Sequence, residues 1–79
     1  MIIRVRFFAS LKDKIGKEEL TINREENMIP LSKLLSDLRN EYPMIPENIL
    51  VAVNLEYRDP GYTVKDSDEI ALITPVSGG

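Results

Sequence analysis

The sequence contains no cysteine and no histidine. Without cysteine it can form no disulfide bond and offers no thiolate nucleophile. Without histidine it lacks the commonest general base and the commonest metal ligand. A catalytic triad and a zinc site are therefore close to excluded, and we expect no metal centre in this chain.

Length and charge narrow the class of protein further. The 79 residues allow one domain, near the lower size limit for folding without covalent or metal cross-links. The net charge of −3 argues against a nucleic-acid binder, which normally presents a basic face. No apolar run approaches the length of a membrane span, and the N-terminus alternates too early for a signal peptide. We expect a cytoplasmic protein with no nucleic-acid and no membrane partner.

The first nine residues have the alternation of a β-strand with one buried face. From Ile2 to Ala9, apolar and charged residues alternate with period two. The apolar face consists of Ile3, Val5 and Phe7. Phe8 breaks the pattern, because it places a large apolar group on the face that carries the arginines Arg4 and Arg6. Phe8 is either a single exposed aromatic residue of the kind that most surfaces carry or a contact point for a partner. We assign the two arginines no site role.

Residues 10–22 predict a helical turn followed by a second strand. Leu11 and Ile15 are four residues apart, Ser10 suits the N-cap, and Gly16 suits the position after the last turn. Residues 19–22 alternate again, and we expect them to return antiparallel to the first strand.

The middle of the chain predicts one helix of about three turns. Its apolar stripe consists of Leu31, Leu34, Leu35, Leu38 and Tyr42. Pro30 fits the first helical position and Pro43 ends the helix. A helix with one apolar face needs a sheet to cover it, so the chain is predicted to be an α+β domain.

Three further strands complete the prediction. Residues 49–53 are a β-rich run that reverses at Asn54, and residues 62–64 predict a short strand of the kind found at a sheet edge. Residues 66–68 are interpreted as a turn rather than a metal site. The last strand spans 69–74, with Ile70 and Leu72 on one face and Ile73 on the other. If the first and last strands are neighbours, Phe8 and Ile73 form an apolar patch beside the arginines, which suits a docking surface.

The end of the sequence carries the most informative motif. After the domain at 1–74, residues 75–79 form a predicted flexible tail that ends in Ser77-Gly78-Gly79. Five extended residues reach roughly 17 Å, and two glycines leave no side chain near the tip. Such a tail can thread a narrow channel and present its carboxylate there. Activation of that carboxylate as an acyl-adenylate would let it accept sulfur or an amine.

Three stretches together resemble one family. Residues 5–9 with Leu11 and Gly16 are similar to the opening of the molybdopterin synthase small subunit. Residues 51–54 resemble its middle strand and turn, and 68–72 through 75–79 resemble its ending. The family usually carries an aromatic residue and a proline where this chain has Ile73 and Thr74. The resemblance implies the ubiquitin-like β-grasp fold, a mixed sheet with one main helix on one face, in which the first and last strands are parallel neighbours.

The resemblance also implies a function, that of a sulfur carrier. An E1-like adenylating enzyme would consume ATP to join AMP to Gly79, and a sulfur donor would convert the adenylate to a thiocarboxylate. The large subunit of molybdopterin synthase would then take the tail and pass sulfur to the pterin precursor. Gly78 and Gly79 would carry the reactive end, and Pro75, Val76 and Ser77 would form its neck. Phe8 and Ile73 would bind the partner, no cofactor would be held, and catalytic groups would belong to the partners.

Three other functions fit the same residues. A carrier for thiamine synthesis or tRNA thiolation shares the fold and ending, although thiamine-pathway carriers tend to be shorter and to lack the Phe-Phe opening. A ubiquitin-like modifier would be joined through Gly79 to lysines of other proteins. A plain interaction module would make no use of its terminal glycines.

Overall fold

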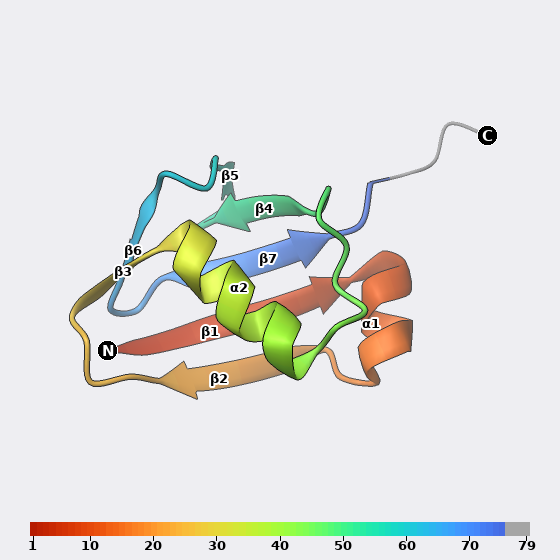
Figure 1. Cartoon of the computed structure of the whole chain (residues 1–79), viewed down its shortest axis with the longest axis horizontal. Coiled ribbons are helices and arrows are strands. Elements are labelled where there is room, and N and C mark those ends of the chain that lie inside the picture. The colour runs from red at the N-terminus through yellow and green to blue at the C-terminus, as the bar shows by residue number, and fades with distance from the viewer. Residues whose placement is uncertain (76–79) are drawn as a thin grey trace.

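The computed structural model describes residues 1–75, and within them the chain forms two helices and seven strands (Figure 1). In chain order these are β1 (Ile2–Phe8), α1 (Ala9–Ile15), β2 (Glu19–Asn23), β3 (Met28–Pro30), α2 (Leu31–Glu41), β4 (Leu50–Val53), β5 (Glu56–Tyr57), β6 (Thr63–Lys65) and β7 (Glu69–Ile73). No helix within that range is long and apolar enough to cross a bilayer.

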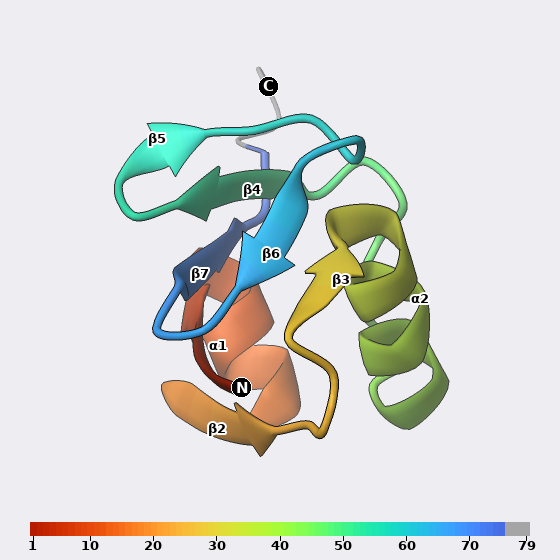
Figure 2. The same ribbon diagram turned by 90° about the vertical axis from the view of Figure 1, so that its left-hand side faces the viewer.

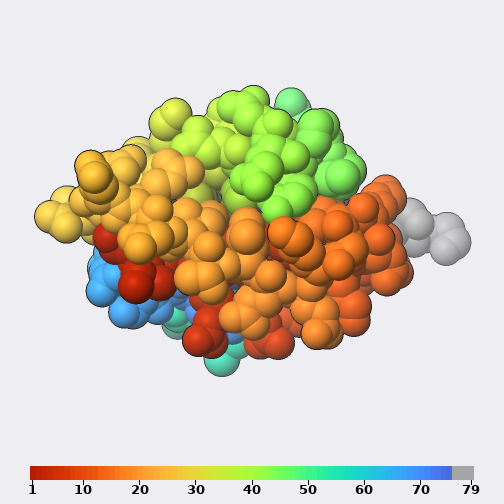
Figure 3. Space-filling view, turned by 90° about the horizontal axis from the view of Figure 1, so that it is seen from below, coloured from red at the N-terminus to blue at the C-terminus, as the bar shows by residue number. Residues whose placement is uncertain are grey.

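The main sheet is mixed and has the strand order β2-β1-β7-β4-β5. β1 pairs parallel with β7, while the pairs β1–β2, β4–β7 and β4–β5 are antiparallel. α2 crosses one face of this sheet, and the opposite face carries no helix among residues 1–75 (Figures 1 and 2). The space-filling view onto the β2 edge shows α2 on one side and atoms of β1 on the other (Figure 3). The predicted α+β fold is confirmed.

The core lies between the sheet and α2. The inner residues of β1, Ile3, Val5 and Phe7, are buried as the alternation predicted. The helix supplies Leu31, Leu34, Leu35 and Leu38, which are also buried. Tyr42 follows the last turn and contacts Phe7 edge to face, with ring centroids 6.0 Å apart. Each buried leucine contributes about 2 kcal/mol through removal of apolar surface from water.

Both predicted helix starts need correction. α1 begins at Ala9, and the residue before it is Phe8, so Ser10 lies inside the first turn and does not cap it. α2 begins at Leu31, one residue after Pro30, which ends β3. Carbonyls of the neighbouring loop accept the first N–H groups of α2, from Leu31 to Tyr62 (2.8 Å) and from Ser32 to Pro60 (3.1 Å). Gly16 adopts a φ of 81° after α1, as predicted.

Two short strands were not predicted from the sequence. β3 pairs with β6 in a separate two-stranded sheet, so the short strand expected at 62–64 is not an edge of the main sheet. β5 pairs with β4 after a two-residue turn at Asn54 and Leu55. The reversal at Asn54 is therefore confirmed, whereas strands of two or three residues are too short for periodicity to detect.

Asp68 is a buried charged residue that joins three segments. Its side chain is 3% exposed and accepts hydrogen bonds from Asn54 Nδ2 (2.9 Å), Tyr62 Oη (3.3 Å) and the Lys65 N–H (3.0 Å). Its backbone carbonyl accepts a bond from the Arg4 N–H at 3.2 Å. Asp68 therefore ties the turn after β4 and the loop before β6 to the start of β7.

Replacing Asp68 by alanine should destabilise the domain strongly. The change leaves the donors from Asn54, Tyr62 and Lys65 without their acceptor, and we expect a loss of about 3 kcal/mol in the free energy of unfolding. Urea unfolding measures this loss. The matched control Asp13→Ala, at an exposed position on α1, should change stability by less than about 0.5 kcal/mol. Equal effects of the two substitutions would contradict the role assigned to Asp68.

Candidate functional site

The sheet face opposite α2 carries an apolar row at one end. The register of β1 and β7 makes Phe8 the direct neighbour of Ile73, and β4 places Leu50 on the other side of Ile73. Phe8 is 38% exposed and Leu50 is 42% exposed. The predicted juxtaposition of Phe8 and Ile73 is confirmed. The position of Leu50 in the same row was not predicted, because the sequence does not show that β4 pairs with β7.

A second row deepens this face into a hollow. Ala71 pairs with Ala52, which in turn pairs with Tyr57 of β5. The two alanines form a low floor between taller side chains, and the hollow has a volume of about 330 Å³. It is lined by Phe8, Ala52, Leu55, Tyr57, Ala71 and Ile73, which we call the outer-face patch. Tyr57 is 70% exposed and Leu55 is 95% exposed, so the patch is open to a partner.

The arginines beside the patch are paired with glutamates. The Arg6 guanidinium lies 5.4 Å from the centre of the Phe8 ring, and its Nη1 lies 3.3 Å from Glu69 Oε1. Arg4 Nε lies 3.0 Å from Glu19 Oε1. The arginines expected beside the patch are therefore present, but as members of exposed ion pairs rather than as free cations. Each such pair contributes less than about 1 kcal/mol to stability.

The route toward the tail starts at the same end of the sheet as the patch. After β7, the Thr74 hydroxyl lies 3.1 Å from the Ser10 hydroxyl on α1, and Pro75 is half-buried. Ser10 thus anchors the chain beyond β7 instead of capping a helix. The remaining predicted site residues, Val76, Ser77, Gly78 and Gly79, lie outside the residues that the structure describes.

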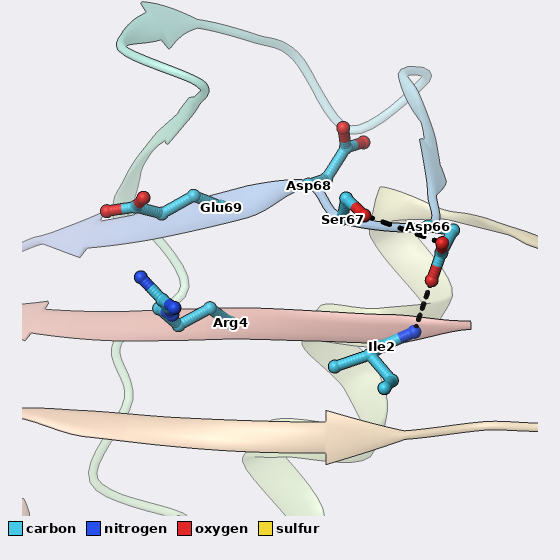
Figure 4. Close-up of a pocket in the computed structure, with 6 residues that line it drawn as sticks. All are labelled: Ile2, Arg4, Asp66, Ser67, Asp68 and Glu69. Carbon is cyan, nitrogen blue, oxygen red and sulfur yellow. Dashed lines mark hydrogen bonds between the residues drawn. The ribbon is translucent and has the colours of Figure 1, made fainter.

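A polar hollow of about 350 Å³ lies at the opposite end of β1 and β7 (Figure 4). It is lined by Ile2, Arg4, Asp66, Ser67, Asp68 and Glu69. The Ile2 N–H donates to Asp66 Oδ1 at 2.7 Å, and this bond lowers the pKa of Asp66 below its ordinary value of 3.8. Glu69 and Arg4 pair with Arg6 and Glu19. Every charged side chain that lines this hollow has a partner within the chain. The cluster therefore stabilises the fold, and we assign it no binding function.

Two sequence comparisons match nearly the whole chain to known proteins. The sequence model of the ThiS family matches residues 5–79. A protein of Dictyostelium discoideum named molybdopterin synthase sulfur carrier subunit is 37% identical, over 96% of this chain and 94% of that protein.

Solved structures agree with the fold. SAMP1 from Haloferax volcanii superposes with a TM-score of 0.83 over the whole of both chains, at 23% identity. A complex of subunits 1 and 2 of the molybdopterin-converting factor from Helicobacter pylori contains a chain that is 29% identical, with a TM-score of 0.66 over the whole of both chains. These matches confirm the ubiquitin-like β-grasp arrangement that the sequence resemblance implied.

Stability should fall in acid through two aspartates with lowered pKa values. Bonds from the Ile2 N–H to Asp66, and from Lys33 and Arg24 to Asp37, favour the charged carboxylates in the folded state. Stability from these groups is present above the ordinary pKa of 3.8 and is lost as the pH falls through the lowered values.

The substitutions Asp66→Asn and Asp37→Asn should therefore flatten the acid side of the stability profile, and the double variant should flatten it most. Urea midpoints measured between pH 2 and pH 7 check this. Parallel profiles for the wild type and the double variant would contradict it.

Proposed function

The chain belongs to the ThiS family, and we propose that it is a sulfur carrier that acts as the small subunit of a molybdopterin synthase. The observation that carries this proposal is the 37% identity, over nearly the full length of both proteins, to a subunit of that name. The Helicobacter pylori complex supports a second subunit as partner, because one of its chains matches this one over its whole length.

The chemistry is proposed to take place at the Gly79 carboxylate. An E1-like enzyme joins this carboxylate to AMP from ATP and releases pyrophosphate. The outer sulfur of a persulfide donor attacks the acyl carbon and expels AMP, and a thiol then cleaves the S–S bond to leave a thiocarboxylate. In the large subunit the thiocarboxylate sulfur bonds to a carbon of the pterin precursor. Water then hydrolyses the acyl–sulfur bond, which leaves the sulfur on the precursor and regenerates the carboxylate. ATP is consumed by the activating partner, so the carrier itself needs no bound cofactor.

The amino-acid composition supports a scheme in which this chain supplies the carboxylate and its partners supply the catalytic groups. Gly78 and Gly79 place no side chain beside the acyl carbon, so a narrow pocket can close around the thiocarboxylate and exclude water. The chain supplies no histidine or cysteine for proton transfer or sulfur relay. In this proposal the acids, the bases and the pterin site all belong to the large subunit.

The outer-face patch is the proposed docking surface for the large subunit. Phe8 and Ile73 stand at the end of β1 and β7 from which Thr74 and Pro75 leave the sheet. A partner that covers Phe8 and Ile73 therefore lies next to the start of the tail. Docking then directs residues 76–79 toward the partner's active site without any rearrangement of the sheet.

The first experiment is a thiocarboxylate-selective label on the chain isolated from its own cells, followed by intact mass and peptide mapping. We expect the label on Gly79. The label is needed because oxidation of one of the three methionines changes the mass almost equally. An isopeptide bond from Gly79 to lysines of other proteins, without any labelled species, would replace the sulfur carrier by a protein modifier.

Phe8→Asp should weaken binding to the large subunit while the domain stays folded. A carboxylate in place of a 38% exposed ring has to be desolvated in the complex, and we expect a loss of about 30-fold in affinity, or about 2 kcal/mol. Calorimetric titration of the purified large subunit measures it. The matched control is Met28→Asp on β3, at a residue that is 65% exposed and outside the patch. Equal loss in both variants, or melting of the domain by Phe8→Asp, would contradict the docking surface.

A further inference from the structure

Leu55 has a left-handed backbone conformation, which glycine adopts far more readily than leucine. It is the second residue of the two-residue turn between β4 and β5, with a φ of 72°, and Asn54 before it has a φ of 50°. Turns with positive φ at both central residues strongly favour Asn-Gly, because a Cβ is unfavourable in the left-handed region. Asn54 fits this preference, whereas Leu55 does not.

The fold gains nothing visible from the leucine side chain. Leu55 is 95% exposed, so it buries almost no apolar surface within the domain. A glycine at this position would relieve the backbone and remove an exposed apolar group at the same time. A residue type that is unfavourable for its backbone conformation, and that gains no packing contact in return, is expected at a functional site.

Leu55 also stands beside the proposed docking surface. It lines the outer-face hollow together with Phe8, Tyr57 and Ile73. The side chain thus extends the apolar surface beyond the strands, at the turn that borders the alanine floor. An aliphatic group in this place can enter a pocket of a protein that covers the hollow.

The turn that carries Leu55 is held firmly. The Asn54 side chain donates to Asp68 Oδ1 (2.9 Å) and accepts from the Glu69 N–H (3.0 Å), and the Asn54 N–H donates to the Glu69 carbonyl (2.9 Å). Three hydrogen bonds from one residue therefore fix the backbone that projects Leu55. A side chain presented on a fixed backbone loses little conformational freedom on binding, which favours affinity.

We propose that Leu55 is a preorganised anchor for the large subunit and inserts into an apolar pocket of that partner. The inference rests on the proposed function, because the occupant is the subunit that receives the tail. The continuity of Leu55 with Phe8 and Ile73 around one hollow is the reason for assigning all three to the same partner. Leu55 is a binding and specificity residue in this scheme and takes no part in the transfer of sulfur.

The decisive variant is Leu55→Gly, because it should change stability and binding in opposite directions. Relief of the left-handed leucine should raise the thermal midpoint by about 4 °C. Loss of the anchor should weaken binding to the large subunit by about 10-fold, measured by calorimetric titration with the intact purified subunit. Leu55→Asn, which suits the turn but is polar, should lose affinity similarly, whereas Leu55→Met should stay within about 3-fold of the wild type.

Ser67→Gly is the matched control. Ser67 has a φ of 70° in the turn between β6 and β7, at the polar hollow rather than the outer-face patch. It should gain thermal stability as Leu55→Gly does, with unchanged affinity. Wild-type affinity in both Leu55→Gly and Leu55→Asn, or a lowered thermal midpoint in Leu55→Gly, would overturn the anchor while leaving the sulfur carrier intact. Absence of any binding by the wild-type chain would overturn both proposals.

Discussion

The parallel pairing of β1 with β7 is the constraint on which both faces of the sheet depend. Its register sets the buried pairs Val5–Ile70 and Phe7–Leu72 on the side of α2, and the pair Phe8–Ile73 on the other side. A slip of one residue would exchange the faces and bring charged side chains into the core. The hydrophobic core therefore selects the same register that assembles the proposed docking surface, and no separate interaction is needed to place Phe8 beside Ile73.

The two ends of the sheet have different physical characters. At the start of β7, the Asp68 carboxylate and the Asn54 amide join the turn after β4 and the loop before β6 by hydrogen bonds with several partners. At the other end, Thr74 and Pro75 leave the sheet beside an open apolar row, with a single hydroxyl contact to Ser10. Stability is thus concentrated away from Phe8, Ile73 and the start of the tail, while the rigid end carries the turn that projects Leu55, the second proposed contact with the partner.

Local patterns in the sequence predicted the residues of the core. They did not predict features that depend on contacts between distant segments of the chain. The alternation in β1 and the leucine stripe of α2 depend on near neighbours, and both were right. The adjacency of Phe8 and Ile73 required a strand order, which the family resemblance supplied. Asp68 was interpreted as an ordinary turn residue because its partners lie in other segments of the chain. The sequence did not single out Leu55, because neither its positive φ nor its exposure can be inferred from local patterns. The Ser10 cap was wrong because Ala9 turns at a φ of 57° and starts α1 one residue early. The roles of Val76, Ser77, Gly78 and Gly79 stay predictions.

The central place of β7 has a consequence for the order of events during synthesis. β7 lies between β1 and β4, so the sheet cannot close until residues 69–73 have left the ribosome. Contacts between such distant segments form late and make folding slow compared with local hairpins. Only four residues separate the end of β7 from Gly78, so the two glycines are synthesised just after the last strand that the sheet needs. If the proposed activating enzyme recognises the assembled sheet, it would act only on folded molecules, and folding would precede the consumption of ATP.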